Sequence, residues 1–243
     1  YLTEISIVRG EIRSHLRHLG RWMRPAPRPT PLKLLPAKSR IVSQPLGQAL
    51  IVAPWNYPVQ LLLNPLVGAI SAGCTALLKP SPYTPNVAEA LEGMIAEIFD
   101  EEYVAVAQGD REVNTLLFDM RWDVIFFTGS PALGRIVMTA AARNLTPVVL
   151  ELGGKSPCIV DETANLRVAA RRLAFGKLLN CGQTCVAPDY LLIDRRVKDA
   201  FLPLLEQEIQ NMVGENALDC DGYVHMINEK HFRRVCGLID PDK

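Results

Sequence analysis

The spacing of hydrophobic positions changes along this chain. Residues 4–23 repeat apolar side chains at helical spacing, with arginines and histidines between them, which predicts an amphipathic helix. From residue 49 onward, short runs rich in Val, Ile and Leu alternate with segments of helical period. This alternation is typical of βαβ units, and it predicts an α/β fold built on a parallel sheet.

Seven short apolar runs are the predicted strands, and helices are expected between them. In the helix after the second run, Thr84 is the expected N-cap and Pro85 the first residue, where a missing N–H does no harm. Its predicted apolar face consists of Ala88, Leu91, Met94, Ile95 and Ile98. The predicted strands cover residues 49–53, 75–79, 103–107, 123–127, 147–150, 157–160 and 190–193.

A proline-rich segment interrupts the pattern before the first of these strands. Four prolines in residues 24–31 enforce an extended backbone and prevent a helix. An ordered connector or dimer-contact arm at about 24–46 is a better interpretation than a ligand for an SH3-type domain. The spacing changes again near residue 151, where we expect a domain boundary.

Composition favours a globular protein with a small partner. The chain has 243 residues, 49% of them hydrophobic, so it can bury a sizeable core. Its 26 basic and 26 acidic residues cancel, which argues against nucleic acid or an anionic membrane as a partner. Polar residues and glycines break the apolar stretch 61–78, so it does not read as a spanning helix. Six dispersed cysteines without a secretory leader favour a reducing, cytoplasmic setting.

Neither the histidines nor the cysteines form a convincing metal site. His15 and His18 could chelate a metal in the first helix, but no third ligand is recognisable and arginines crowd them. Cys181 and Cys185 also lack companion ligands, so we expect no zinc.

Two segments are candidates for holding an anionic cofactor. A strand ends in Gly129 and Ser130, and the helix over 131–143 that follows would offer its N-terminus to a phosphate, with Gly134 allowing close approach. The spacing differs from Gly-x-Gly-x-x-Gly, so a tight turn without a ligand remains an alternative. Lys79 ends another strand, where ligands bind in open α/β sheets, although it could simply be solvated.

Four residues could take part in covalent catalysis. A nucleophilic thiol such as Cys181 or Cys185 needs deprotonation and donors for the oxyanion that it creates. Glu151 lies between two leucines, and apolar surroundings make a carboxylate a better general base. A surface carboxylate on an edge strand is the plainer alternative. The amide of Asn56 could donate to an oxyanion, or its segment could be only a turn into a helix.

Five motifs together resemble the aldehyde dehydrogenase superfamily, in order and at suitable spacing, and most closely its class-3 branch, which includes fatty aldehyde dehydrogenases. They are Pro54-Trp-Asn-Tyr-Pro58, Lys79-Pro-Ser81, Phe127-Thr-Gly-Ser130, Glu151-Leu-Gly-Gly-Lys-Ser-Pro157 and Gly182-Gln-Thr-Cys-Val-Ala-Pro-Asp-Tyr190. The resemblance covers essentially the whole chain.

This resemblance implies oxidation of an aldehyde to a carboxylic acid with NAD, or NADP, as cofactor. Cys185 is then the nucleophile, Asn56 and the Cys185 backbone N–H are the oxyanion donors, and Glu151 activates the deacylating water. A thiohemiacetal and an acyl thioester are the implied intermediates, and Cys181 is a bystander.

The resemblance also assigns the cofactor contacts and the domains. Gly129, Ser130 and Gly134 face the pyrophosphate, Lys79 the adenosine ribose, and Trp55 and Leu152 the cofactor near the reacting centre. Residues 1–151 would form a Rossmann-like NAD(P)-binding domain that includes the proline-rich arm, and 152–243 an incomplete α/β catalytic domain. We expect a fragment of a longer protein that is a homodimer when complete.

Two departures from the family pattern matter. Pro82 stands where many members have a glutamate that binds the ribose hydroxyls, so we expect NADP to be accepted as well as NAD. The Glu-x-Phe-Gly-Pro motif is not found after Cys185, and residues 97–100 only echo it.

Three alternative functions stay open at this point. A relative that passes the acyl group to coenzyme A is one, although Glu151 argues against it. The others are a non-catalytic or oligomerisation remnant of such an enzyme, and a redox thiol protein using Cys181 and Cys185.

Overall fold

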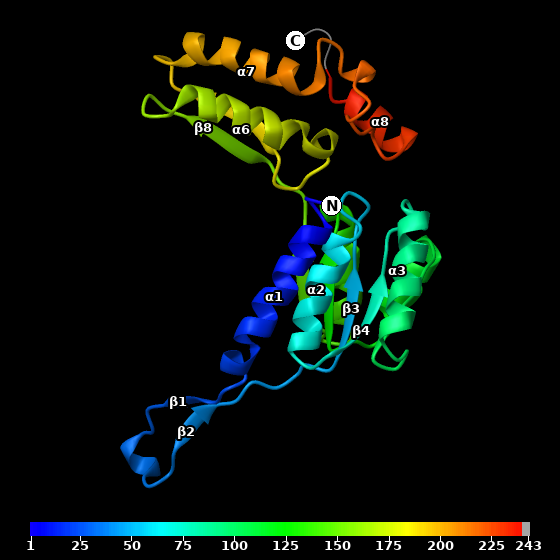
Figure 1. The fold of residues 1–243 in the computed structure, drawn as a ribbon. Coiled ribbons are helices and arrows are strands. Elements are labelled where there is room, and N and C mark those ends of the chain that lie inside the picture. The colour runs from blue at the N-terminus through cyan, green and yellow to red at the C-terminus, as the bar shows by residue number, and fades with distance from the viewer. Residues whose placement is uncertain (240–243) are drawn as a thin grey trace. The chain divides into compact units, whose positions relative to one another are not determined.

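The computed structural model describes residues 1–239 and divides into two compact units, Tyr1–Glu151 and Leu152–Lys243. The first unit is built on a five-stranded sheet in the order β5-β4-β3-β6-β7, in which every pair is parallel (Figure 1). Its strands are β3 (Gln48–Val52), β4 (Thr75–Lys79), β5 (Val104–Val106), β6 (Val124–Thr128) and β7 (Val148–Glu151).

The predicted parallel α/β sheet is confirmed. All seven predicted strands are present, each within two residues of its predicted ends. Prediction succeeded because helices cover both faces of a parallel sheet, so its strands are nearly continuous apolar runs. β3 shows this clearly, since Ala49, Leu50, Ile51 and Val52 are all at most 5% exposed.

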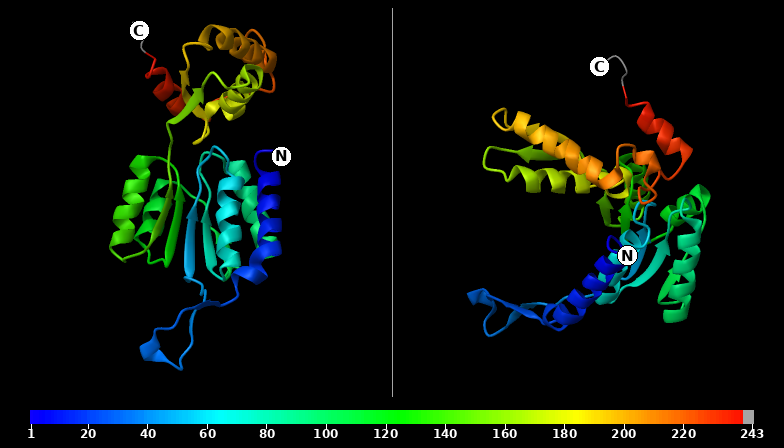
Figure 2. Two further views of the ribbon diagram at one scale, coloured as in Figure 1. Left: turned by 90° about the vertical axis from the view of Figure 1, so that its left-hand side faces the viewer. Right: turned by 45° about the horizontal axis from the view of Figure 1, so that its top comes forward.

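Helices cover both faces of this sheet. They are α2 (Gln60–Ser71), α3 (Pro85–Ile98), α4 (Arg111–Asp119) and α5 (Pro131–Ala142). Figure 2, left, shows α4 and α5 on one side of the strands and α2 on the other. A core cluster that includes Ile51, Leu62, Leu78, Leu91 and Ile95 joins α2 and α3 to the sheet.

The predicted details of α3 are partly wrong. Thr84 and Pro85 occupy the expected N-cap and first positions, but the Thr84 hydroxyl donates to the Ser81 carbonyl at 3.3 Å instead of capping the helix. Met94 and Ile98 are 37% and 59% exposed, because Met94 lies at the margin of the buried stripe and Ile98 is the last helical residue.

The N-terminal amphipathic helix is present as α1 (Ile5–Trp22), and it packs on α2. His15 is bound by protein groups, with Nδ1 2.7 Å from the Ser71 hydroxyl and Nε2 3.0 Å from the Glu11 carboxylate. Within residues 1–239, no group of three or more His, Cys, Asp or Glu side chains is arranged to hold a metal ion.

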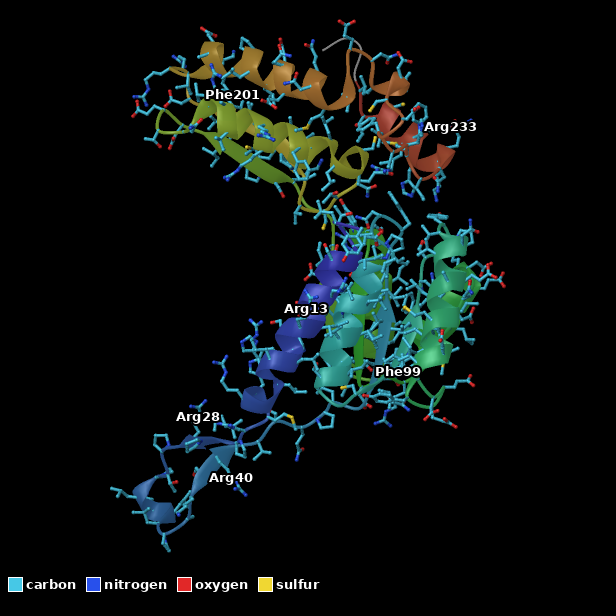
Figure 3. The ribbon with its side chains drawn as sticks, in the orientation of Figure 1. Arg13, Arg28, Arg40, Phe99, Phe201 and Arg233 are labelled. Carbon is cyan, nitrogen blue, oxygen red and sulfur yellow. The ribbon has the colours of Figure 1, made fainter. Side chains whose placement is uncertain are left out.

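The proline-rich arm forms a hairpin. Its backbone is extended as predicted, but β1 (Ala26–Arg28) also pairs with β2 (Ser39–Ile41) in antiparallel register, which the sequence did not suggest. The 3₁₀ helix η1 (Leu32–Leu34) lies between them. Arg28 and Arg40, labelled in Figure 3, come from the two strands and are exposed. No helix in the described part of the chain is long and apolar enough to cross a membrane.

The second unit has a smaller sheet, in which β8 (Ser156–Val160) pairs in parallel with β9 (Pro188–Ile193). Val160, Ala170 and the fully buried Phe201 form its core (Figure 3). The crossover from β8 to β9 is the helix α6 (Leu166–Leu178), which the sequence predicted. The remaining elements are η2 (Leu179–Gly182), α7 (Lys198–Val213), η3 (Ala217–Asp219) and α8 (Glu229–Cys236).

One carboxylate links the starts of α1 and α2. Glu4 is the N-cap residue of α1, but its side chain makes no bond within that helix. Its Oε2 instead accepts hydrogen bonds from the backbone N–H groups of Val59, at 2.7 Å, and Gln60, at 3.1 Å. These are donors that the first turn of α2 leaves without a partner inside the helix, so Glu4 acts as a cap supplied by another helix.

We therefore expect Glu4→Ala to lower the free energy of unfolding by about 1 kcal/mol, the usual effect of losing an N-cap. Amide hydrogen exchange should become faster at Val59 and Gln60. The control is Glu101→Ala, because Glu101 is an exposed residue in the turn before β5. Unchanged exchange at both amides would show that the hydrogen bonds to Glu4 do not stabilise the start of α2.

Candidate active site

The candidate residues of the first unit gather at one edge of its sheet. In a parallel sheet all carboxyl ends lie on the same side, and ligands bind where the strand order reverses. Here the order reverses between β3, which continues to β4 and β5 on one side, and β6, which continues to β7 on the other. Asn56 follows β3 and Gly129 follows β6, so both lie at this switch point.

The segment 54–58 after β3 is held by backbone and packing contacts. The Ala53 N–H donates to the Lys79 carbonyl at 3.1 Å, and the Leu61 N–H donates to the Tyr57 carbonyl at 3.0 Å. Tyr57 is buried, whereas Trp55 and Asn56 are half-buried. Glu4 fixes the next two residues, so the Asn56 segment is anchored at both ends.

The turn between β6 and α5 has the geometry of a capped helix start. The Ser130 hydroxyl accepts from the Leu133 N–H at 3.3 Å, and Gly134 is buried in the first turn of α5. The Gly129 N–H donates to the Glu151 carbonyl at 2.9 Å. A Cβ on Gly129 would lie 2.6 Å from Cζ of Phe127, so packing on the sheet already requires glycine here.

Lys79 is buried, so the solvated alternative for this residue was wrong. It is 1% exposed, and its Nζ donates to the carbonyls of Pro80 at 2.9 Å and Gly109 at 2.7 Å. Burial lowers the pKa of Lys79, and the nearby Asp110 carboxylate opposes that lowering. The amine thus joins the segments that follow β4 and β5.

A cavity of about 490 Å³ lies beside these segments. Its lining includes Ser81, Pro82, Gln108, Gly109 and Asp110, from the ends of β4 and β5. The volume is within the range of small-molecule sites, and a site at the carboxyl ends of strands is typical of nucleotide-binding α/β folds.

Glu151 is the last residue of β7, and its side chain is exposed. The expected apolar enclosure by Leu150 and Leu152 was therefore wrong. Successive side chains in a strand point to opposite faces, so sequence neighbours do not surround one another. Glu151 is a solvent-accessible carboxylate beside the Gly129 turn.

In the second unit, Cys185 is exposed and Leu152 is half-buried. The Cys185 carbonyl packs against Gly154, because a Cβ on that glycine would lie 2.5 Å from the carbonyl oxygen. Gly154 belongs to the turn that follows Glu151 in sequence. Cys181 is only partly exposed and contacts the Tyr223 hydroxyl.

Two polar residues near the candidate site were missed. Gln183 binds backbone groups of Asn180, His225 and Ile227. Its place in the motif of residues 182–190, two residues before Cys185, was a signal, but His225 and Ile227 are 42 and 44 residues away and could not be found from local pattern. Glu4 gave no signal, since it reads as an ordinary helix-start carboxylate.

The sequence profile of the aldehyde dehydrogenase family matches residues 5–243. The chain belongs to the aldehyde dehydrogenase family. The expected resemblance is thereby confirmed, and it covers almost every residue.

Relatives agree with the class-3 resemblance. The chain is 46% identical to the 4,4'-diaponeurosporen-aldehyde dehydrogenase of Staphylococcus aureus over 240 residues, 99% of this chain and 52% of that protein. It is 42% identical to aldehyde dehydrogenase family 3 member B2 of Mus musculus, covering 98% of this chain and 50% of that protein. It is also 42% identical to a dimeric NADP-preferring aldehyde dehydrogenase of Rattus norvegicus, and the match covers 100% of this chain and 54% of that protein.

Solved structures share the fold. The substrate-bound state of Staphylococcus aureus AldH superposes with a TM-score of 0.92 at 46% identity, covering 98% of this chain and 52% of that one. A Mycobacterium tuberculosis aldehyde dehydrogenase complexed with NAD⁺ gives a TM-score of 0.83 at 30% identity, and the match covers 97% of this chain and 49% of that one. The chain therefore spans about half the length of the relatives it matches.

The burial of Lys79 predicts a pH effect on the stability of this aldehyde dehydrogenase chain. Because folding lowers the pKa of Lys79, the folded chain holds that proton less readily than the unfolded chain, where the pKa is 10.5. The contribution of Lys79 to the free energy of unfolding should therefore rise as the pH increases toward 10.5.

We expect the free energy of unfolding of the wild type, relative to Lys79→Met, to increase between neutral pH and a pH just below 10.5. The comparison is made by denaturant titration at each pH. Lys38→Met, at an exposed lysine of the same unit, should show no such change. If the free energy of unfolding of Lys79→Met and of Lys38→Met changed equally with pH relative to the wild type, the lowered pKa of Lys79 would be contradicted.

Proposed function

We propose that this chain carries the nucleophile and the cofactor-binding edge of a class-3 aldehyde dehydrogenase that oxidises an aldehyde to a carboxylic acid with NAD(P)⁺. The observation that carries the proposal is the exposed Cys185 thiol, packed through its backbone against the turn after Glu151, in a chain of this family.

The proposed reaction has two covalent stages. The Cys185 thiol first loses its proton to solvent. The thiolate Sγ attacks the carbonyl carbon of the aldehyde, and the resulting oxyanion accepts hydrogen bonds from the Asn56 amide and the Cys185 backbone N–H. When bound, the nicotinamide cofactor accepts the hydride that leaves the thiohemiacetal carbon. Glu151 then takes a proton from water, whose oxygen attacks the acyl thioester and displaces the Cys185 thiolate, and the acid is released. Transfer of the proton from Glu151 to the sulfur restores the free thiol and the carboxylate. The exposure of Glu151 is compatible with reaching that water.

The cofactor fits the donors at the carboxyl edge of the first sheet. The N-terminus of α5, with Gly129, Ser130 and Gly134, suits a pyrophosphate, and the cavity beside Pro82 is large enough for a nucleoside. Lys79 would face the ribose, and Trp55 and Leu152 would lie nearer the nicotinamide. Lys79 already has carbonyl partners, so we expect it to shape this pocket as well as contact the ribose.

Substrate, assembly and location follow the family by analogy only. Long-chain aliphatic and aromatic aldehydes are the substrates to test first. We propose a homodimer for the whole protein, since one relative is named as dimeric, and a reducing, cytoplasmic setting, since all six cysteines are free.

Cys185→Ala should abolish aldehyde-dependent formation of reduced nicotinamide, because it removes the atom that forms the covalent bond. The assay uses a medium-chain and an aromatic aldehyde with each cofactor. Cys236→Ala, at an exposed cysteine on α8, is the matched control and should retain most of the activity. Turnover by Cys185→Ala, or loss of turnover in Cys236→Ala alone, would show that Cys185 is not the nucleophile. Release of an acyl-coenzyme A in place of the acid would favour the acylating alternative.

Cofactor choice provides a separate prediction. Pro82, in the lining of the cavity, supplies no carboxylate to repel a 2′-phosphate, so NADP⁺ should be accepted as well as NAD⁺. We expect kcat/KM values for the two cofactors to differ by less than about a hundredfold, or ~2.7 kcal/mol. Pro82→Glu should shift the preference toward NAD⁺. A larger NAD⁺ preference in the wild type would sink this prediction.

A further inference from the structure

The residues just before Cys185 have an unusual backbone. Asn180, Cys181 and Gly182 all have positive φ angles, of 53°, 54° and 70°. Two of them are not glycine, and left-handed backbone at such residues costs free energy unless surrounding contacts fix it. Something in the second unit must therefore hold this turn.

Gln183 supplies those contacts. Its Nε2 donates to the Asn180 carbonyl at 3.0 Å and to the His225 carbonyl at 3.3 Å, and its Oε1 accepts from the Ile227 N–H at 3.1 Å. The Gln183 backbone N–H also donates to the Asn180 carbonyl at 3.0 Å. A single amide thus closes the left-handed turn and joins it to residues 225–227.

A second contact joins the same two segments. Cys181 lies against the Tyr223 hydroxyl, and burial, together with the hydrogen bond to Cys181, raises the pKa of Tyr223 to about 12. The segment 223–227 is attached to the cysteine loop at two points.

The anchored loop holds apolar groups in solvent. Cys185 is exposed and the next residue, Val186, is 73% exposed. Apolar side chains favour burial by roughly 1.5–3 kcal/mol for a group such as Val, so an unanchored loop would tend to collapse and cover them. The contacts of Gln183 oppose that collapse.

We propose that Gln183 is a positioning residue, which keeps the Cys185 thiol presented to substrate by anchoring its loop to residues 225–227. This inference rests on the proposed function, because it takes Cys185 as the nucleophile. Gln183 itself touches no reacting atom in this account. It acts through the backbone of the loop.

The test measures presentation of the thiol without requiring turnover. Alkylation of Cys185 by iodoacetamide is followed peptide by peptide by mass spectrometry in the full chain, with the exposed Cys236 as an internal reference. Gln183→Glu keeps the acceptor for Ile227 but loses both donated bonds, and Gln183→Met loses all three. The matched control is Gln207→Glu, at an exposed glutamine on α7.

We expect Cys185 alkylation to slow at least about threefold, roughly 0.65 kcal/mol, in Gln183→Glu and further in Gln183→Met, with Cys236 and Gln207→Glu unchanged. In the turnover assay, kcat should fall in step with alkylation while KM for the aldehyde stays nearly constant. An unchanged Cys185 rate in both variants would overturn the proposal. An equal change in the alkylation rate of Cys236 would also overturn it, because it would indicate that the substitution destabilises the second unit as a whole.

The two proposals fail in different ways. Absence of aldehyde oxidation by the wild type would contradict the proposed function, whereas the alkylation rates would still decide whether Gln183 controls exposure of the thiol. If the wild type turns over and Gln183→Met alkylates slowly but keeps its kcat, the positioning role is wrong while the proposed function stands.

Discussion

The parallel pairing of β3 with β4 on one side and β6 on the other is the constraint on which the first unit depends. Because all five strands run in the same direction, every segment that leaves a carboxyl end emerges at one edge. Asn56, Lys79, Gly129 and Glu151 are far apart in sequence, yet each lies at or just after such an end. The common direction of the strands is sufficient to bring these four residues of the first unit to one edge.

Much of this arrangement could be predicted from sequence. The strands could be found because doubly covered parallel strands are continuous apolar runs, and Gly129-Ser130 could be placed because Pro131 marks the start of a helix. Lys79 was correctly placed at a strand end, but its burial depends on the carbonyl of Gly109, 30 residues away. Local pattern carries no information about such a partner.

The same reason explains what was missed. Glu4 caps a helix that begins more than 50 residues later, and Gln183 binds backbone groups more than 40 residues ahead of it. The pairing of β1 with β2 joins proline-rich and polar stretches that have no strand pattern. The enclosure expected around Glu151 was wrong for a local reason: side chains alternate between the two faces of a strand, so the leucines next to Glu151 in sequence do not surround its carboxylate.

The order of the strands also affects how the chain is made. Ala49 pairs with Val124, so the second partner of the central strand is synthesised 75 residues after the strand itself. At about 5–20 residues per second, an almost wholly apolar strand waits several seconds on the ribosome with one hydrogen-bonding edge open. Such an edge can pair with other chains. The strand that carries the Asn56 loop can therefore also pair with other chains during synthesis.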